Sequence, residues 1–275
     1  MSPDWLDAAR RAAAALRGIL GERPTTAERV LETGTRGEGG DRTLEIDALA
    51  EEAVFDQLTR LYDEGARFTV VSEERGTVDF GGDGVLVMVD PIDGSMNAKR
   101  RLPHHCLSIA VAEGPLMADV VFGFVQDFGP EEEWVAWRGR GATLNGEPLD
   151  RRVGERRWSD GKLELVGFES ADPRWVLRSA DGLVQVAHRL RAIGTIAAAL
   201  CQVAAARFDG MLTLKGCRAV DAAAAQLVVR ESGGLVAFTM FEEPLAAPLD
   251  LLPHSPVVAA RSEEALRELA SVPRM

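Results

Sequence analysis

The chain has 275 residues, of which 46% are hydrophobic and 27% are charged, and its formal net charge at pH 7 is −12. A chain of this length and composition can bury a large core, which disfavours disorder, and its negative charge without a basic stripe disfavours nucleic-acid binding. No apolar run approaches the roughly 18 residues of a membrane span, and no basic segment followed by an apolar core opens the chain, so the sequence favours a cytoplasmic protein without a membrane partner.

The first part of the chain is predicted to begin with two helices and continue with strands. Apolar residues at helical spacing predict a helix over residues 4–20 and a second helix that follows a Gly-rich loop at residues 36–41 and carries Asp47 near its start. Strands are predicted at residues 68–71, 85–89, 106–112, 119–126 and 133–137, and a turn region at residues 139–146. The first two strand patterns are nearly all apolar, as in strands buried on both faces.

From about residue 160 the pattern alternates strands and helices. Strands are predicted at residues 163–168, 188–193, 211–214 and 257–260. Helices are predicted from Gly194-Thr195 to about residue 206, from Asp221 to the Gly233-Gly234 pair, and over residues 263–270. Three widely spaced cysteines, Cys106, Cys201 and Cys217, indicate reduced thiols rather than a disulfide framework.

Carboxylates follow two of the buried strands, with Glu73 after the first and Asp90 after the second. The second strand leads into Asp90-Pro91-Ile92-Asp93-Gly94-Ser95, where Pro91 keeps Asp90 extended and Gly94 allows the backbone to approach a ligand closely. Two acids three residues apart, together with a carbonyl, are hard oxygen ligands of the kind that Mg²⁺ requires. An Asp-Pro turn without function is the alternative for the dipeptide alone.

This segment resembles the metal-binding signature of the inositol monophosphatase family, within the fructose-1,6-bisphosphatase superfamily. Other elements of the family pattern appear in the same order: Asp41 to Asp47, Ser72-Glu73-Glu74, Ala219 to Ala224 and Glu231-Ser232-Gly233-Gly234. The run from Gly94 to Lys99 is more similar to archaeal-type members, several of which accept both inositol monophosphate and fructose 1,6-bisphosphate. Ser95 and Val220 depart from the commonest pattern, which has Thr and Trp there.

The resemblance implies a role for each matching residue. Glu73, Asp90, the Ile92 carbonyl, Asp93 and Asp221 would hold two to three Mg²⁺ ions, with Mn²⁺ as an alternative metal. Asp47 and Ser95, with Glu73, would form the catalytic group that orients and deprotonates the attacking water. The reaction would be in-line hydrolysis of a phosphate monoester without a covalent enzyme intermediate.

The resemblance also implies a five-layered α/β/α/β/α sandwich. An N-terminal lobe of residues 1–155 would carry most metal ligands, and a C-terminal lobe of residues 156–275 would carry Asp221 and substrate contacts. Members of the family are commonly homodimers, and intact ligands of the second metal imply lithium sensitivity.

The predicted substrate is a small phosphorylated sugar or cyclitol. Gly194-Thr195-Ile196 resembles the family element that contacts the substrate ring, although Thr195 also fits a simple helix cap, and Gly94 and Ser95 present amides to an anion. Where inositol-selective members carry a Glu before Asp221, this chain has Thr213-Leu214-Lys215, so Lys215 or Arg218 could contact a second phosphate.

Two alternatives remain at this stage. The first is a 3'-phosphoadenosine or NADP phosphatase of the same superfamily, which a chain with one Tyr and no aromatic pair near the signatures mildly disfavours. The second is a noncatalytic regulator that binds metal or phosphate. A transition-metal site at His104-His105 is disfavoured, since adjacent side chains of a strand point to opposite faces.

Overall fold

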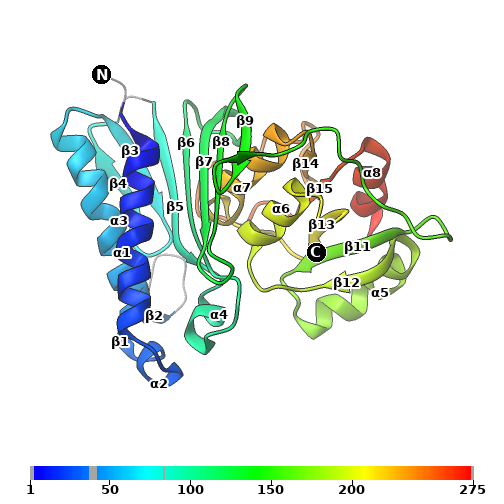
Figure 1. Cartoon of the computed structure of the whole chain (residues 1–275), viewed down its shortest axis with the longest axis horizontal. Helices are drawn as coiled ribbons and strands as arrows, with labels where there is room; N and C mark the ends of the chain where they lie inside the picture. The colour runs from blue at the N-terminus through cyan, green and yellow to red at the C-terminus, as the bar shows by residue number, and fades with distance from the viewer. Residues whose placement is uncertain (1–2, 37–41, 83, 274–275) are drawn as a thin grey trace.

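The computed structural model describes residues 3–36, 42–82 and 84–273, and these form five layers (Figure 1). Helices α1 and α3 cover one face of an eight-stranded sheet, α6 and α7 lie between this sheet and a five-stranded one, and α5 and α8 cover the far side. Their bounds are α1 (Trp5–Glu22), α3 (Glu45–Asp63), α5 (Pro173–Val186), α6 (Ile196–Ala204), α7 (Ala219–Glu231) and α8 (Glu263–Ser271). The predicted α/β/α/β/α sandwich is confirmed.

The larger sheet is mainly antiparallel. Its strands, in spatial order, are β10 (Glu147–Pro148), β9 (Gly141–Leu144), β8 (Glu132–Trp137), β7 (Val120–Asp127), β6 (Cys106–Ala112), β5 (Leu86–Asp93), β3 (Phe68–Ser72) and β4 (Gly76–Phe80). The neighbours β3 and β5 are parallel, and Ser72 pairs with Val89. The residues that follow these two partners, Glu73 and Asp90, therefore lie at the same edge of the sheet.

The smaller sheet has the order β12 (Ala187–Arg191), β11 (Leu163–Glu169), β13 (Gly210–Thr213), β15 (Val257–Ala260) and β14 (Leu235–Phe238). Strand β11 is parallel to both of its neighbours, and β15 is antiparallel to both of its own. The connection between the sheets spans residues 149–162, where the predicted lobe boundary at residue 155 falls. That boundary stays a prediction.

The middle layer explains the alanine-rich sequence of its helices. Eight of the nine residues of α6 are buried, and so are twelve of the thirteen residues of α7, because both faces pack against sheets. Small side chains let the layers approach closely: a Cβ on Gly123 of β7 would lie 2.5 Å from the carbonyl oxygen of Ala224 in α7. A helix buried on all sides is expected to be apolar all round, and α6 departs from this only at Gln202, whereas α7 also buries polar residues, among them Asp221 of the candidate site.

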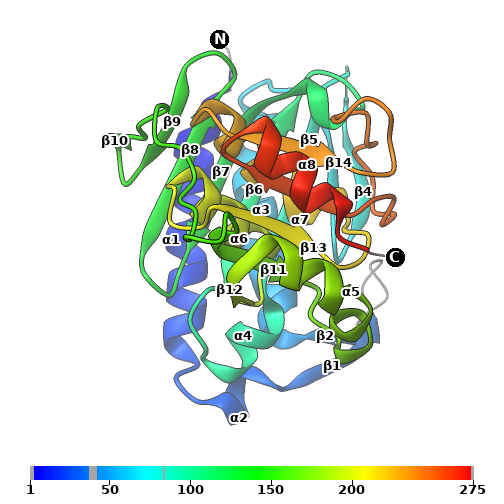
Figure 2. The ribbon, with the colours of Figure 1, turned by 90° about the vertical axis from the view of Figure 1, so that its right-hand side faces the viewer.

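Shorter elements complete the lower end of the molecule in Figure 2, which looks onto α5 and α8. They are α2 (Thr26–Arg29), β1 (Glu32–Arg36), β2 (Arg42–Leu44) and α4 (Ser95–Arg100), and a single 3₁₀ turn, η1 (Met117–Asp119), lies before β7. The helix suggested at Gly94-Ser95 is thus present as α4. Residues 37–41 of the predicted Gly-rich loop, including Asp41, lie outside the described residues.

Several predicted boundaries were wrong. Strand β5 does not end before Asp90 but continues to Asp93 through an irregularity, since a bulge accommodates Pro91. The predicted turn region at residues 139–146 contains β9, and α7 begins two residues before Asp221. The sequence reasoning missed α5, although its Asp172 cap and Pro173 at the first position are typical helix-start signals. It also missed β4 and β14, which are short.

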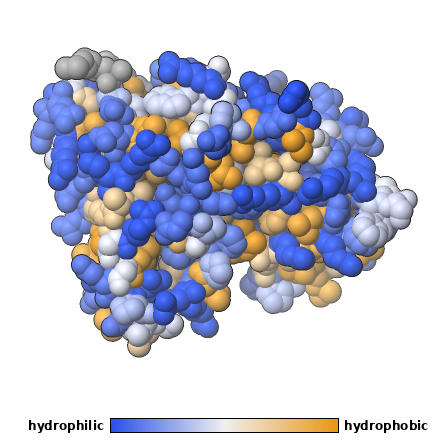
Figure 3. Space-filling model, viewed as in Figure 1, coloured by the Kyte–Doolittle hydropathy of each residue, from blue (hydrophilic) through white to orange (hydrophobic). Residues whose placement is uncertain are grey.

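Among the described residues, no helix is long and apolar enough to cross a membrane. Hydrophilic residues predominate on the face shown in Figure 3, which is indented at its lower edge. Cys106, Cys201 and Cys217 are all buried and free, as predicted.

Candidate active site

The acidic segment lies at a bulge in β5. Asp90 pairs with Ser108 and Asp93 pairs with Cys106, so the register shifts between the two acids. The Asp90 carboxylate accepts a hydrogen bond from the Ile92 amide (3.0 Å), which holds the bulge together. Both carboxylates are buried, with 1% of Asp90 and 8% of Asp93 exposed. The bulge therefore presents two carboxylates from one strand.

Gly94 connects this bulge to α4 through a conformation that favours glycine. Its φ is +84°, and a Cβ there would lie 3.0 Å from the His104 carbonyl oxygen and 3.1 Å from that of Gly194. Ser95 is then the first residue of α4. Any larger residue at position 94 would push apart segments that are far apart in the sequence.

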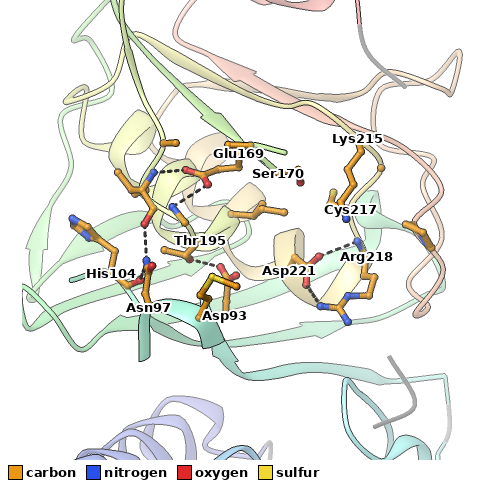
Figure 4. Close-up of a pocket in the computed structure, with 18 of the residues that line it drawn as sticks. Asp93, Asn97, His104, Glu169, Ser170, Thr195, Lys215, Cys217, Arg218 and Asp221 are labelled. Atoms are coloured by element: carbon orange, nitrogen blue, oxygen red, sulfur yellow. Dashed lines mark hydrogen bonds and ion pairs between the residues drawn. The ribbon is translucent and has the colours of Figure 1, made fainter. Parts of the chain in front are cut away.

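Asp93 also binds the start of α6. Its Oδ2 atom accepts hydrogen bonds from the Thr195 hydroxyl and from the Ala197 amide (2.7 Å), while the Thr195 oxygen accepts one from Ala198 (3.2 Å) (Figure 4). The interpretation of Thr195 as a helix cap is thus confirmed, and its role in substrate binding stays a prediction. This contact joins β5 of the larger sheet to the start of α6 in the middle layer.

Glu73, Asp90, Asp93 and Asp221 influence one another electrostatically. Burial, with the charges of the neighbouring acids, raises the pKa of Glu73 to about 7, that of Asp93 to about 7, and that of Asp90 well above its usual value. Such shifts mean that ionised carboxylates repel one another in a region that water scarcely reaches. A group of this kind needs positive charge nearby.

Arg218 supplies part of that charge. Its guanidinium lies 2.7 Å from a Glu73 oxygen and 3.2 Å from an Asp221 oxygen (Figure 4 shows the second pair). Burial acts to lower the pKa of Arg218, but the charges of Asp221 and Glu73 outweigh it and raise the pKa. The sequence analysis considered Arg218 only for a second phosphate, whereas here it pairs with two predicted metal ligands.

The donor set fits a magnesium ion in its chemistry. All four side chains are carboxylates, which are the hard oxygen ligands that Mg²⁺ prefers. Within the described ranges, however, no three acidic, histidine or cysteine side chains are arranged to hold a metal ion as they stand. Arg218 lies between Glu73 and Asp221, so an ion that bound both acids would have to displace the guanidinium.

A cavity of about 900 Å³ opens beside these acids. Its walls come from both sheets, with Asp93 and Asn97 on one side and Asp221 on another (Figure 4). The other predicted residues that line it are Gly194, Thr195, Ile196, Lys215 and Arg218. Gly94 contacts Gly194, as described, and Lys215 is exposed at the cavity. Asp47 lies buried in the first turn of α3, and its pairing with Ser95 stays a prediction.

The sequence reasoning missed Glu169, which lines the same cavity. It is 3% exposed and accepts hydrogen bonds from the amides of Ile193 (2.9 Å) and Gly194 (3.0 Å), and burial raises its pKa to about 8. A signal was available: Glu169 directly follows the predicted strand 163–168, just as Glu73 and Asp90 follow theirs. Glu169 therefore holds in place the loop of Ile193 and Gly194, which leads to Thr195 at the start of α6.

The two adjacent histidines face different cavities, as expected. His104 lines the cavity of about 900 Å³, where its Nδ1 lies 2.8 Å from an Asp127 oxygen, whereas His105 lines a separate one. The physical reason differs from the predicted one, because both residues precede β6 and His104 has a φ of +65°. Asn97 holds this segment with hydrogen bonds from its Nδ2 to the carbonyls of His104 (2.9 Å) and Ile193 (2.7 Å).

The chain is similar in sequence to proteins of known family. A model of the inositol monophosphatase family matches residues 4–273. A fructose-1,6-bisphosphatase/inositol-1-monophosphatase of Thermococcus kodakarensis is 37% identical over 198 residues, covering 72% of this chain and 70% of the relative. One of the same description from Methanothermobacter thermautotrophicus is 31% identical over 211 residues (73% and 72%). The Nus factor SuhB of Escherichia coli K12 is 32% identical over 235 residues (84% of each).

Solved structures share the fold. A crystal structure of an inositol monophosphatase-fructose 1,6 bisphosphatase superposes with a TM-score of 0.81 at 21% identity, covering 98% of this chain and 99% of the other. An inositol monophosphatase from Anabaena gives a TM-score of 0.73 at 23% identity, with 98% and 97% covered.

Proposed function

The chain belongs to the inositol monophosphatase family of phosphomonoesterases, and we propose that it is a magnesium-dependent phosphatase acting on inositol monophosphate, fructose 1,6-bisphosphate or both. The observation that carries this proposal is the convergence of four acids, Glu73, Asp90, Asp93 and Asp221, beside a cavity of about 900 Å³. Burial and mutual repulsion raise the pKa of the first three, and one arginine, Arg218, offsets only part of the negative charge. A phosphate ester could approach such a site only with added positive charge, which divalent cations supply.

The chain's own residues would divide the work as follows. Magnesium held by these four acids and the Ile92 carbonyl would supply a water of lowered pKa and neutralise developing charge. Asp47 and Ser95 would orient the attacking water and accept its proton, with Glu73 supporting them. Asp93, held rigidly by the start of α6, would keep its remaining oxygen aimed at the site.

Substrate contacts would come mainly from the other side of the cavity. The loop that Glu169 fixes would present Gly194, Thr195 and Ile196 to the sugar or cyclitol ring, and Gly94, which adjoins Gly194, would contribute its amide together with Ser95. Lys215, exposed at the cavity, is suited to a second phosphate, and no acid stands at Thr213 to Lys215 to bind ring hydroxyls. Relatives described as acting on both ester types support this dual range.

Further properties belong to the same proposal. Manganese would substitute for magnesium, lithium would compete for the second metal position, and two copies of the chain would form a homodimer.

The second candidate is a noncatalytic regulator that binds metal or phosphate. It is favoured by the similarity to relatives described as Nus factor SuhB. The presence of Asp47 and Ser95, together with Asp93, favours a catalytic role. A protein that only binds metal or phosphate does not require the pair Asp47 and Ser95 to activate water. A 3'-phosphoadenosine or NADP phosphatase remains the alternative within the superfamily.

One screen separates these candidates. Phosphate release is measured from inositol 1-phosphate, fructose 1,6-bisphosphate, 3'-phosphoadenosine 5'-phosphate and NADP, each with magnesium and with EDTA. We expect turnover of one or both of the first two, lost in EDTA. Turnover of only the nucleotides would support the superfamily alternative, absence of any turnover would support the regulator, and undiminished turnover in EDTA would exclude the metal mechanism.

A further inference from the structure

A second cavity, of about 410 Å³, lies on the opposite side of the segment at residues 101–105 from the catalytic cavity. Leu102 and Pro103 line both cavities, so this short segment forms a shared wall. The remaining walls come from α1 and the residues after it, from α2, and from the turn after β7. None of the predicted catalytic, metal-binding or substrate-binding residues lines this cavity.

The cavity contains a buried positive charge with no anionic partner. Arg29 is 8% exposed, and its guanidinium donates three hydrogen bonds of 2.8 Å, to the carbonyl oxygens of Leu20, Arg23 and Ala98. Among the described residues, no carboxylate forms an ion pair with it. Burial and the nearby charge of Arg101 lower the pKa of Arg29, so its charged form is less favourable here than in water. A guanidinium has five N–H donors, which leaves capacity for a ligand.

A second buried group, the imidazole of His105, belongs to the same cavity wall. His105 is 7% exposed, and its buried Nδ1 atom has no hydrogen-bond partner in the part of the chain that the structure describes. Its ring packs at a tilt against Phe128, with 5.9 Å between the ring centroids. Buried polar atoms of native proteins are nearly always satisfied by protein, water or ligand. His105 is thus, after Arg29, a second nearly buried polar side chain in the wall of this cavity.

The mouth of the cavity adds further positive charge. Arg17 and Arg101 are both exposed there, and Glu131 is the acid among the lining residues. Glu131 pairs with Arg17 at 2.7 Å, whereas Arg101 has no ion pair within the described residues. Three arginines and one glutamate leave about two positive charges around this cavity, in a chain whose net charge is −12. A positive patch on a chain that is negative overall attracts anions to this cavity.

We propose that this cavity binds a small molecule through a phosphate group. A phosphate dianion matches the surplus of two positive charges, which a single carboxylate would not, and guanidinium groups bind phosphate oxygens in a fork geometry. The volume lies within the range of small-molecule sites. Leu20, Leu102 and Phe128 supply apolar walls for the rest of the molecule.

The test uses metal-free protein in EDTA, where the four acids of the catalytic site repel anions, and inorganic phosphate at millimolar concentration as the probe. Calorimetry compares the wild type with Arg101→Gln and with the matched control Arg100→Gln, since Arg100 is exposed and lines neither cavity. We expect the wild type and the control to bind alike and Arg101→Gln to bind about tenfold more weakly, as loss of a charge-assisted hydrogen bond implies. Equal binding by Arg101→Gln, or no binding by the wild type, overturns the proposal.

Imidazole NMR gives the location independently. The chain has four histidines, so the His105 resonances can be assigned with a His105→Gln variant. We expect phosphate to shift the His105 ring signals in the metal-free wild type. A shift of the His104 signals without one at His105 would mean that phosphate enters the catalytic cavity instead, and the proposal would be wrong.

Discussion

Replacing Asp93 with asparagine separates the charge of the proposed metal site from its packing. The Oδ2 atom of Asp93 accepts hydrogen bonds from the Thr195 hydroxyl and from the Ala197 amide. The amide oxygen of asparagine can accept both, so the contact with α6 is kept. What the variant loses is one negative charge among four neighbouring acids, three of which are buried.

The direction and size of the effect on stability follow from the pKa of Asp93. Burial and the charge of Asp221 raise it from the usual 3.8 to about 7, so the folded state holds this proton more tightly than the unfolded state does. One pKa unit corresponds to ~1.4 kcal/mol, and the free energy of unfolding therefore falls as the pH rises between these two values, by up to about 4 kcal/mol. Because the neighbouring acids share this cost, we expect Asp93→Asn to raise the free energy of unfolding by about 1–3 kcal/mol at pH 8 without metal.

Activity should change in the opposite direction. With magnesium, we expect phosphate release to fall at least about a hundredfold, equivalent to ~2.7 kcal/mol of transition-state stabilisation. Urea denaturation in EDTA at pH 8 and at pH 4, together with the phosphate-release assay, measures both quantities. The stability gain should vanish at pH 4, where the acid is largely protonated in the folded state. A variant that is destabilised in EDTA, or that keeps wild-type turnover with magnesium, would refute the reasoning.

Asp209→Asn is the matched control. Asp209 is also buried, but its two oxygens each accept a backbone hydrogen bond of 2.8 Å, from Arg156 and Leu165, and it does not line the proposed active-site cavity. Asparagine there places an amide N–H₂ against a backbone N–H, so we expect lower stability with turnover per folded molecule unchanged.

Three further predictions follow from the structure. Arg218→Met removes the guanidinium that pairs with two of the four acids, so we expect magnesium to bind about tenfold more tightly at pH 8 in calorimetry without substrate, and unchanged or weaker binding would contradict this. Gly123→Ala places a methyl group 2.5 Å from the Ala224 carbonyl oxygen, so urea denaturation should show a free energy of unfolding lower by about 1–3 kcal/mol. The control Gly154→Ala has open space around it and should change that free energy by less than ~0.5 kcal/mol. Equal effects of the two variants would refute the close packing of β7 against α7. Burial raises the pKa of Glu169 from 4.5 to about 8, so the wild-type free energy of unfolding should decline as the pH rises between those values, and Glu169→Gln should decline less steeply in denaturant titrations; an unchanged slope would count against the burial argument.

Local sequence patterns were sufficient to predict much of the fold. The first helix was predicted at residues 4–20 and is α1, and the apolar runs at residues 68–71 and 106–112 are β3 and β6. These patterns succeed because a buried strand or an amphipathic helix needs apolar residues at a fixed period, whatever it packs against. Helix α5 could also have been predicted from a local pattern, because Asp172 caps it and Pro173 occupies its first turn.

Other features depended on contacts between distant residues. The sequence placed Asp90 and Asp93 at a strand end, but the bulge that accommodates Pro91 within β5 is set by pairing with β6. The ion pair between Arg218 and Glu73 joins residues 145 positions apart, and Asp93 meets Ala197 across 104 positions. No local pattern encodes such a pairing, because it arises only when two sheets pack on a shared layer of helices.

The sequence by itself predicted many of the helices and strands from local apolar patterns, and its motifs resemble those of the inositol monophosphatase family. That resemblance, rather than any local pattern, implied the layered α/β/α/β/α architecture and the set of acids at the proposed metal site. Only the tertiary structure decided that Arg218 already occupies the space between two of those acids, that Glu169 holds the loop facing them, and that Arg29 and His105 line a second cavity. The physical reason is that the charge and hydrogen bonds of a buried side chain are balanced by the residues around it in space. Tertiary packing, rather than position along the chain, determines which residues those are.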